Sequence, residues 1–115
     1  MPCSAFNLDY LNEVFEGNSK SVQEVILIFL EGLPVSKELM RISVNKKDTE
    51  GLRKAAHKLK SSLRALGAKE LADLTAQIEN KSEMNFNEID YLWNEFQRLM
   101  PVLESQLVEF IKEQK

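Results

Sequence analysis

Apolar residues recur every three or four positions along most of this chain, which is the period of one face of an α-helix. No stretch shows the alternation of apolar and polar residues that marks a half-buried β-strand. Turn-forming residues are also scarce, with 4 Gly and 3 Pro in 115 residues, which argues against a turn-rich sandwich or barrel. The sequence therefore predicts an all-α fold.

Capping and helix-ending residues divide this pattern into a short first helix and four longer ones. Pro34 and Pro101 lie inside two of the predicted ranges, but the apolar spacing continues in phase, so we expect kinked helices rather than breaks. The segment 82–87 is polar and turn-like. In chain order, the predicted helices run from Asn7 to Gly17, from Ser19 or Ser21 to about Asn45, from Asp48 or Thr49 to Gly67, from about Ala68 to Lys81, and from about Asn87 to the end.

Most of these helices have a single apolar face, which they can bury only against one another. This favours an antiparallel four-helix bundle with a short additional N-terminal helix, in one domain over residues 1–115. The run 25–30 is instead apolar on every side of its helix. Our preferred interpretation is that the first helix covers its outer side, and the alternative is an exposed docking patch. The predicted buried face of the first helix contains Leu8, Leu11, Val14 and Phe15.

Composition argues against several classes of function. The formal net charge of −3 argues against a general nucleic-acid binder, and one histidine with one cysteine excludes an ordinary structural zinc site. The longest apolar run, 25–30, is far shorter than the roughly 20 residues of a membrane-spanning helix. The opening residues lack the basic and apolar regions of a signal peptide, so we expect a cytoplasmic protein with no membrane or nucleic-acid partner.

The single histidine, His57, lies in the predicted third helix and outside its apolar face. With Leu52 at zero on a helical wheel, the apolar stripe spans roughly −60° to +40°, and His57 falls near roughly 140°. Lys60 and Arg64 fall near roughly 80° and 120°. Between residues 51 and 67 the chain carries five Lys or Arg residues and no acidic residue, so we expect His57 to be exposed in a positive field.

Two interpretations fit an exposed histidine on a basic helix. In the simpler one, it is an ordinary surface residue. In the other, the neighbouring positive charges disfavour the protonated ring and leave a neutral, nucleophilic imidazole. The same charges would stabilise a phosphoryl group carried on the ring, because they can contact its anionic oxygens. Helical periodicity alone does not choose between the two.

The residues that follow His57 have a characteristic order. They are a hydrophobic residue, a lysine, a small residue and a serine two, three, four and five positions on, with Gly67 ten positions after the histidine. Together with residues 8–11, the pair Gly17 and Asn18, and the long second helix, this run resembles the histidine-containing phosphotransfer (HPt) domain. The resemblance covers essentially the whole chain, and it outweighs the simpler interpretation of His57.

The resemblance implies a helical bundle that carries phosphoryl groups between proteins. His57 matches the phosphorylated histidine, which accepts the group from an aspartyl phosphate and passes it to another aspartate. Lys60 matches a lysine that helps to hold the phosphoryl oxygens, and Glu79 matches a residue hydrogen-bonded to the other ring nitrogen. Gly67 matches the glycine that ends the histidine-bearing helix.

The partners that the resemblance implies are receiver domains of response regulators and a sensor or hybrid histidine kinase. Mg²⁺ is expected only on the partner receiver domain, whose acidic pocket would complement the basic helix. The chain itself is expected to need no cofactor or metal, to be a phosphocarrier rather than an enzyme, and to be a monomer. No glycine-rich nucleotide-binding loop is present in the sequence.

The sequence departs from the family at Ser61, where a glycine is usual and gives a flat surface for the partner. A hydroxymethyl group is small, so we expect access to be retained, with an effect on rate or partner choice. Lys58 and Arg64 are further candidates for contacting the phosphoryl group or the partner. Leu11 and Phe15 are candidates for an apolar docking patch near the histidine.

Two alternatives to a phosphocarrier remain open. One is a helical interaction module that has lost phosphotransfer, although the presence of His57, Lys60 and Glu79 argues against it. The other is a small hydrolase that uses His57 with Glu79 as a general base. The hydrolase lacks a visible oxyanion hole, and it needs a concave pocket that a short bundle rarely supplies.

Overall fold

The computed structural model describes residues 4–81 and 86–114. Helices account for most of these residues, and neither range contains a β-strand, so the predicted all-α fold is confirmed. Residues 82–85, which belong to the predicted turn, lie outside the described residues. In chain order the helices are α1 (Asp9–Val14), α2 (Ser19–Lys46), α3 (Thr49–Ala65), α4 (Lys69–Lys81) and α5 (Phe86–Glu113).

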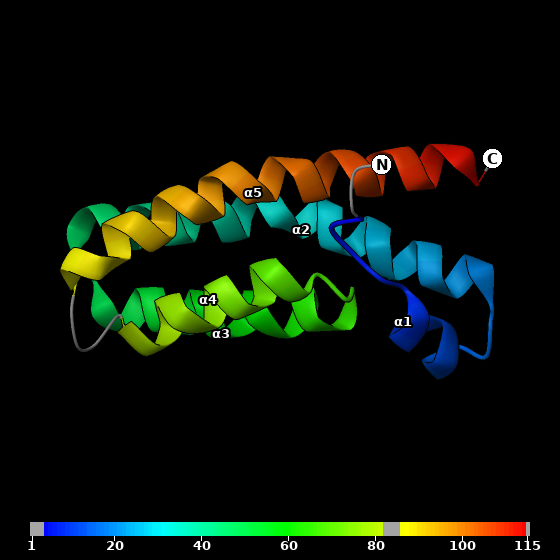
Figure 1. Ribbon diagram of the computed structural model, residues 1–115, viewed down its shortest axis with the longest axis horizontal. Coiled ribbons are helices and arrows are strands. Elements are labelled where there is room, and N and C mark those ends of the chain that lie inside the picture. Colours follow the sequence, from blue (N-terminus) through cyan, green and yellow to red (C-terminus); the bar gives the residue numbers. More distant parts are fainter. Residues whose placement is uncertain (1–3, 82–85, 115) are drawn as a thin grey trace.

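The four longer helices form an antiparallel bundle, in which α2 and α4 each pack against both α3 and α5 (Figure 1). α2 and α5 have 28 residues each and extend past the shorter pair, α3 with 17 residues and α4 with 13. α1 lies beside this extension and contacts α2 (Figure 1). The arrangement matches the predicted four-helix bundle with a short additional helix, and one side of α3 and of α4 stays open to solvent.

Side-chain caps fix where α2 and α3 begin. The Oδ1 of Asn18 accepts a hydrogen bond from the N–H of Ser21 at 3.0 Å, so Asn18 caps α2 in place of the predicted Ser19 or Ser21. The same geometry recurs at α3, where Asp48 Oδ1 accepts from the N–H of Gly51 at 3.0 Å. Asparagine and aspartate suit this position because their short side chains reach a free N–H of the first helical turn.

Gly67 ends the histidine-bearing helix, as predicted, with a φ of +64° that favours glycine. Just beyond it, the N–H of Ala68 donates to the carbonyl of Leu63 at 2.9 Å, which closes the last turn of α3. The N-terminal segment crosses the same turn, since the N–H of Asn7 donates to the carbonyl of Leu66 at 3.0 Å. A Cβ on Gly67 would collide with the backbone of Asn7, so both conformation and contact require glycine here.

The core lies between the long helices, and α2 and α5 continue through Pro34 and Pro101 as single helices. In α1, Leu11 is buried, but Val14 is exposed, contrary to the predicted face. The reason is that α1 has only six residues and packs on α2, so one side chain is enough to fill the contact. The largest fully buried side chains are Phe96, Ile26, Leu33, Met40, Leu52, Leu63, Leu66, Ile78, Ile89, Met100, Leu103 and Leu107.

Candidate functional site

Three residues singled out by the sequence meet on the outer side of α3 and α4. The Nδ1 of His57 lies 2.8 Å from Oε2 of Glu79, and the Nζ of Lys60 lies 2.6 Å from Oε1 of the same carboxylate. His57 and Lys60 lie one turn apart on α3, and Glu79 comes from the C-terminal part of α4. The packing of these two helices therefore brings together residues 19 and 22 positions apart in the chain.

The three side chains differ in exposure. The His57 side chain is 62% exposed, whereas those of Lys60 and Glu79 are 14% and 15% exposed. On α3, Lys60 lies between His57 and the buried stripe, so its aliphatic stem covers the bundle while its ammonium group reaches Glu79. The ring is thus open to a partner, and the ion pair beside it is largely shielded from water.

Glu79 is held as a carboxylate. Burial by itself raises the pKa of Glu79, but hydrogen bonds from Lys60 and His57 and the neighbouring positive charge outweigh it, and the net pKa lies below its ordinary value. An ionised carboxylate only accepts hydrogen bonds, so Nδ1 of His57 carries the proton in this contact. In the neutral ring, the free lone pair is therefore on Nε2.

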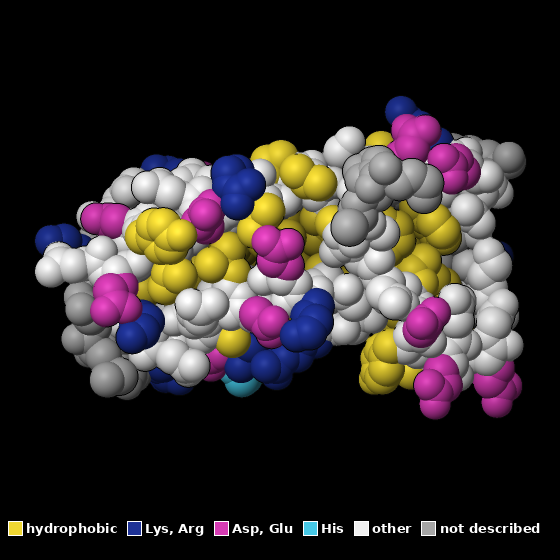
Figure 2. All heavy atoms as spheres, in the orientation of Figure 1, with side chains coloured by type: hydrophobic (Ala, Val, Ile, Leu, Met, Phe, Trp, Pro, Cys, Tyr) yellow, Lys and Arg dark blue, Asp and Glu magenta, His cyan; other side chains and the backbone are white. Residues whose placement is uncertain are grey.

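The surface around the ring is basic. Lys58 and Arg64 are exposed on α3, and Figure 2 shows the histidine at the surface beside a group of Lys and Arg side chains. The hydroxyl of Ser61 is turned toward its own helix, where it donates to the main-chain oxygen of His57 at 3.4 Å. This surface can attract an anionic group. The small side chain of Ser61 adds little bulk beside the His57 ring.

An apolar groove of about 380 Å³ runs between α2 and α3, and it is lined on α3 by residues that include Lys58, which follows His57 in the chain. Its α2 wall includes Ile28 and Val35, whose exposed fractions are 69% and 65%, and Lys58 lies on its α3 wall. The preferred interpretation of the run 25–30 is therefore wrong at Leu27 and Ile28, because α1 does not cover them. The exposed apolar surface is the alternative that the sequence left open.

Sequence reasoning missed how far this surface extends along α2. Ile28, Val35, Leu39 and Ile42 are all exposed, and they form a second apolar stripe roughly opposite the buried one on the helical wheel. A wheel drawn over the whole of α2 would have found it. The buried stripe, which includes Leu33, dominates the pattern, and a second stripe does not disturb its period.

The residues of α1 contribute less to a docking surface than predicted. Leu11 is 4% exposed, so it packs inside the protein and is not available to a partner. Phe15 is half-buried against the core. The large apolar side chains that α1 does expose are Tyr10 and Val14.

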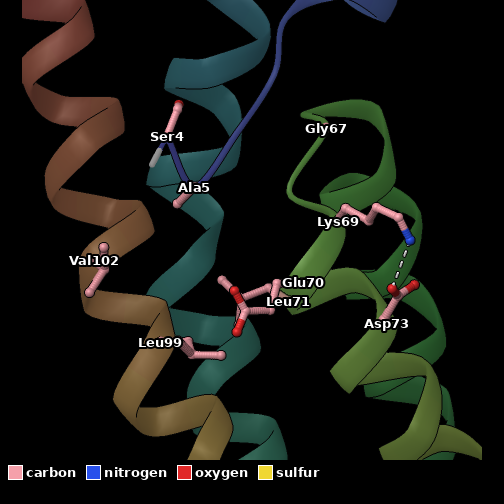
Figure 3. Close-up of a pocket in the computed structure, with 9 residues that line it drawn as sticks. All are labelled: Ser4, Ala5, Gly67, Lys69, Glu70, Leu71, Asp73, Leu99 and Val102. Atoms are coloured by element: carbon pink, nitrogen blue, oxygen red, sulfur yellow. Dashed lines mark hydrogen bonds and ion pairs between the residues drawn. The ribbon is translucent and has the colours of Figure 1, made fainter. Parts of the chain in front are cut away.

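A second cavity, of about 500 Å³, lies between the N-terminal segment, α4 and α5 (Figure 3). Figure 3 shows Leu99 of α5 pointing across it toward Glu70 and Leu71 of α4. Neither His57 nor Glu79 lines this cavity, so it does not supply the concave pocket that a hydrolase built on those two residues needs.

Among residues 4–81 and 86–114, no group of three or more His, Cys, Asp or Glu side chains is placed to hold a metal ion. No helix in residues 4–81 or 86–114 is both long enough and apolar enough to cross a membrane.

Comparison with known families places this geometry in context. The family model described as the Hpt domain matches residues 24–108, which include α3, α4 and every residue of the His57–Lys60–Glu79 cluster. No curated protein and no solved structure matches the chain. Hpt domains act as phosphocarriers in two-component signalling, and a solvent-exposed histidine on an all-helical bundle fits that role. The chain belongs to the Hpt domain family.

Proposed function

We propose that this protein is a phosphorelay intermediate that carries a phosphoryl group on Nε2 of His57. The observation that supports this most is the state of the ring: Nδ1 is bound to Glu79 at 2.8 Å, while the side chain is 62% exposed. The bound nitrogen, Nδ1, carries the one N–H proton of the neutral ring, and its hydrogen bond fixes the orientation of the ring. The other nitrogen keeps its lone pair free for a partner.

The transfer step balances without a change in the protonation of the ring. The Nε2 lone pair of His57 attacks the phosphorus of an aspartyl phosphate on a receiver domain. The bond between phosphorus and the aspartyl oxygen breaks, and its electron pair leaves with the aspartate carboxylate. The proton on Nδ1 stays in its hydrogen bond with Glu79, which stabilises the positive ring formed in the product. Passage to a second receiver domain is the same reaction in reverse.

Positive charges on α3 favour this reaction electrostatically. Lys60, Lys58 and Arg64 lie on the same helix as His57, and a phosphoryl group on the ring is anionic. Phosphoryl transfer depends mainly on positioning and charge stabilisation, so this chain supplies a nucleophile, a field and a docking surface. The partner receiver domain supplies the aspartate and Mg²⁺.

The groove between α2 and α3 is the proposed contact surface for the receiver domain. Its α3 wall includes Lys58, the residue after His57, and its α2 wall exposes Ile28, Val35 and Leu39. An interface there would bury apolar surface on the α2 side of the histidine-bearing helix, with Lys58 in its α3 wall facing an acidic partner. The sensor or hybrid histidine kinase would supply the phosphoryl group through such a receiver domain, and the protein would act as a cytoplasmic monomer.

The direct test is incubation with a receiver domain that has been phosphorylated on its aspartate. We expect the protein to gain a label that acid removes and alkali does not, and we expect His57→Gln to gain none. Phosphorus NMR of the labelled protein should show a single Nε2-linked species. A label that persists in His57→Gln would contradict the proposal.

The two alternatives give different results in the same experiment. An interaction module that has lost phosphotransfer would bind the receiver domain and gain no label. A hydrolase would turn over a small ester or amide in a reaction that needs His57. The exposure of His57 argues against the second, since its side chain is 62% exposed and His57 lines neither the α2–α3 groove nor the cavity between α4 and α5.

A further inference from the structure

The second apolar stripe of α2 has nearly the same pattern when it is read from either end. Ile28, Val35 and Ile42 recur at intervals of seven residues, so two isoleucines lie symmetrically on either side of a central valine. Their exposed fractions are 69%, 65% and 37%, and Leu39 adds a fourth exposed side chain. At a helical rise of about 1.5 Å per residue, the stripe is about 21 Å long.

Opposite charges stand at the two ends of this stripe. With Ile28 at zero on a helical wheel, Glu24 falls near roughly −40° and Lys46 near roughly 0°, on the same face as the apolar side chains. Both are exposed, and neither takes part in an ion pair among residues 4–81 and 86–114. Each lies eleven residues from Val35. The outer face of α2 is therefore symmetric in apolar character about Val35 and opposite in charge.

This pattern fits a second copy of α2 in the antiparallel orientation. A two-fold axis through Val35 would bring Ile28 of one chain opposite Ile42 of the other, and Glu24 opposite Lys46 at both ends. A parallel pair would instead place the two Glu24 side chains together and the two Lys46 side chains together, and like charges repel. The seven-residue spacing suits two helices that cross at about 20° and stay in contact along the stripe.

The centre of the stripe has room for another helix. Gly32 lies three residues before Val35, and a Cβ on Gly32 would meet nothing within 4 Å, so the backbone of α2 is bare there. The Val35 side chain of a second chain can pack against this bare surface, as a side chain of one helix fills a gap on the other. Gly32, Val35 and Leu39 also line the groove between α2 and α3.

We propose that the outer face of α2 is the interface of a two-fold symmetric, antiparallel dimer. Each chain would cover Ile28, Val35 and Leu39 of the other, and these residues line the groove between α2 and α3. The dimer would then be unable to bind a receiver domain through that groove, and the monomer is the form that can. This consequence rests on the proposed function, whereas the dimer itself does not.

Sedimentation velocity over a range of protein concentrations tests for the dimer. One helix face from each chain is smaller than the interface of a permanent dimer, so the association is reversible. We expect the mass to rise from one chain toward two between micromolar and millimolar protein. Val35→Asp places two carboxylates at the two-fold axis, and we expect it to raise the dissociation constant at least about tenfold.

The matched control for Val35→Asp is Val102→Asp. Val102 follows Pro101 in α5 as Val35 follows Pro34 in α2, it is 48% exposed, and it lines the cavity between α4 and α5. We expect Val102→Asp to associate like wild type. A wild-type protein that stays monomeric at millimolar concentration would overturn the inference, and so would equal weakening by the two substitutions.

Charge reversals test the orientation of the two chains. Glu24→Lys and Lys46→Glu each replace two attractive pairs by two repulsive ones, so each should raise the dissociation constant severalfold at low ionic strength. The double variant Glu24→Lys/Lys46→Glu restores opposite charges at both ends and should return the constant to near the wild-type value. A double variant no tighter than the two single variants would overturn the antiparallel arrangement.

Addition of an unphosphorylated receiver domain tests whether the dimer covers the groove. In concentrated wild-type protein we expect one-to-one complexes to replace the dimers. A complex that contains two copies of this chain would overturn the shared surface.

The dimer and the phosphocarrier can fail separately. Labelling by a phosphorylated receiver domain is measured on dilute protein, in which the monomer dominates. Labelling of a wild-type protein whose mass does not depend on concentration would reject the dimer and keep the phosphocarrier. Association that Val35→Asp weakens, in a protein that gains no label, would keep the dimer and reject the phosphocarrier.

Discussion

We expect Ser61 to limit how closely a partner can approach His57. It lies one turn after the histidine, and its hydroxyl donates to the main-chain oxygen of His57 at 3.4 Å. The side chain still adds bulk where a bare helix surface would let a receiver domain come nearer. We expect Ser61→Gly to raise the phosphotransfer rate severalfold, while glycine in the middle of α3 lowers the free energy of unfolding by about 1 kcal/mol.

Stopped-flow or quench-flow transfer from a phosphorylated receiver domain measures this rate. Ser105→Gly is the control, since it makes the same substitution at an exposed position inside α5, away from the histidine-bearing helix. If Ser61→Gly and Ser105→Gly changed the rate equally, access at residue 61 would not be what limits transfer.

Glu79 links the site to the acid stability of the fold. Its pKa is lower in the folded protein than its ordinary value, so its interactions stabilise the fold above the ordinary pKa of glutamate. That contribution is lost as the pH falls through the lowered pKa, because the carboxyl group must then be protonated. We expect Glu79→Gln to reduce the difference in unfolding free energy between pH 7 and pH 3.

Urea unfolding followed by circular dichroism at the two pH values checks this prediction. If Glu79→Gln lowered the free energy of unfolding equally at both pH values, the variant would have lost contacts, and the pH dependence would not come from Glu79.

The sequence specifies the exposure of His57 but not its hydrogen bonds. Five helical steps from Leu52 are enough to place the ring outside the apolar face of α3, because wheel angles depend only on spacing. The contact with Glu79 depends on how α4 packs against α3, and no local pattern fixes that. Only the family resemblance pointed to Glu79, and it did not reveal that Lys60 binds the same carboxylate.

The turn between α3 and α4 depends on one glycine for two separate reasons. Gly67 has a φ of +64°, and the backbone of Asn7 lies where its Cβ would be. We expect Gly67→Ala to lower the free energy of unfolding by about 2 kcal/mol or more, since it combines left-handed strain with displacement of the N-terminal segment. Urea unfolding measures the change.

Gly32 provides the matched comparison, because it lies in the interior of α2 and a Cβ there meets nothing within 4 Å. Gly32→Ala should therefore raise the free energy of unfolding by about 0.5 to 1 kcal/mol. Destabilisation by both substitutions to the same extent would contradict the special role of Gly67.

Helix ends were predictable where a single residue type decides them. Gly67 ends α3 and Asp48 begins it, both as the sequence indicates. α2 shows the limit: it ends at Lys46, and the capping residue Lys47 adopts a positive φ of 54° although lysine has no preference for that conformation. The start of α2 also differs from the prediction, since Asn18 caps it in place of Ser19 or Ser21. The sequence assigned Asn18 to the end of the first helix, and its second role as a cap was not evident from the pattern.

Charge is unevenly distributed over the protein, and in the proposed function this would orient it toward a partner. The net charge is −3, yet the stretch between residues 51 and 67 carries only basic charges. An acidic receiver domain would be steered toward this helix and repelled elsewhere, which speeds productive encounter without adding contact area. The apolar stripe of α2 lies beside the same helix, so attraction and burial act on one face of the bundle.

Two exposed valines on different faces of the bundle can test where a receiver domain docks. Val35 and Val102 each follow a proline inside a long helix, and they are 65% and 48% exposed. Val35 lines the groove between α2 and α3, whereas Val102 lines the cavity between α4 and α5 on another face. We expect Val35→Asp to slow transfer from a phosphorylated receiver domain at least about tenfold, because a charge would be buried in an apolar interface.

Val102→Asp should leave the transfer rate within about twofold of wild type, because an exposed surface substitution outside the interface costs little. Both variants place the same carboxylate in the same local sequence context, after a helical proline, so the difference between them reports location alone. Transfer rates at several receiver concentrations separate weaker docking from slower chemistry: a higher half-saturation with an unchanged maximal rate is the expected result for Val35→Asp. Equal slowing by both substitutions would place the receiver domain away from the α2–α3 groove, and His57 would then have to be approached from the side of α4.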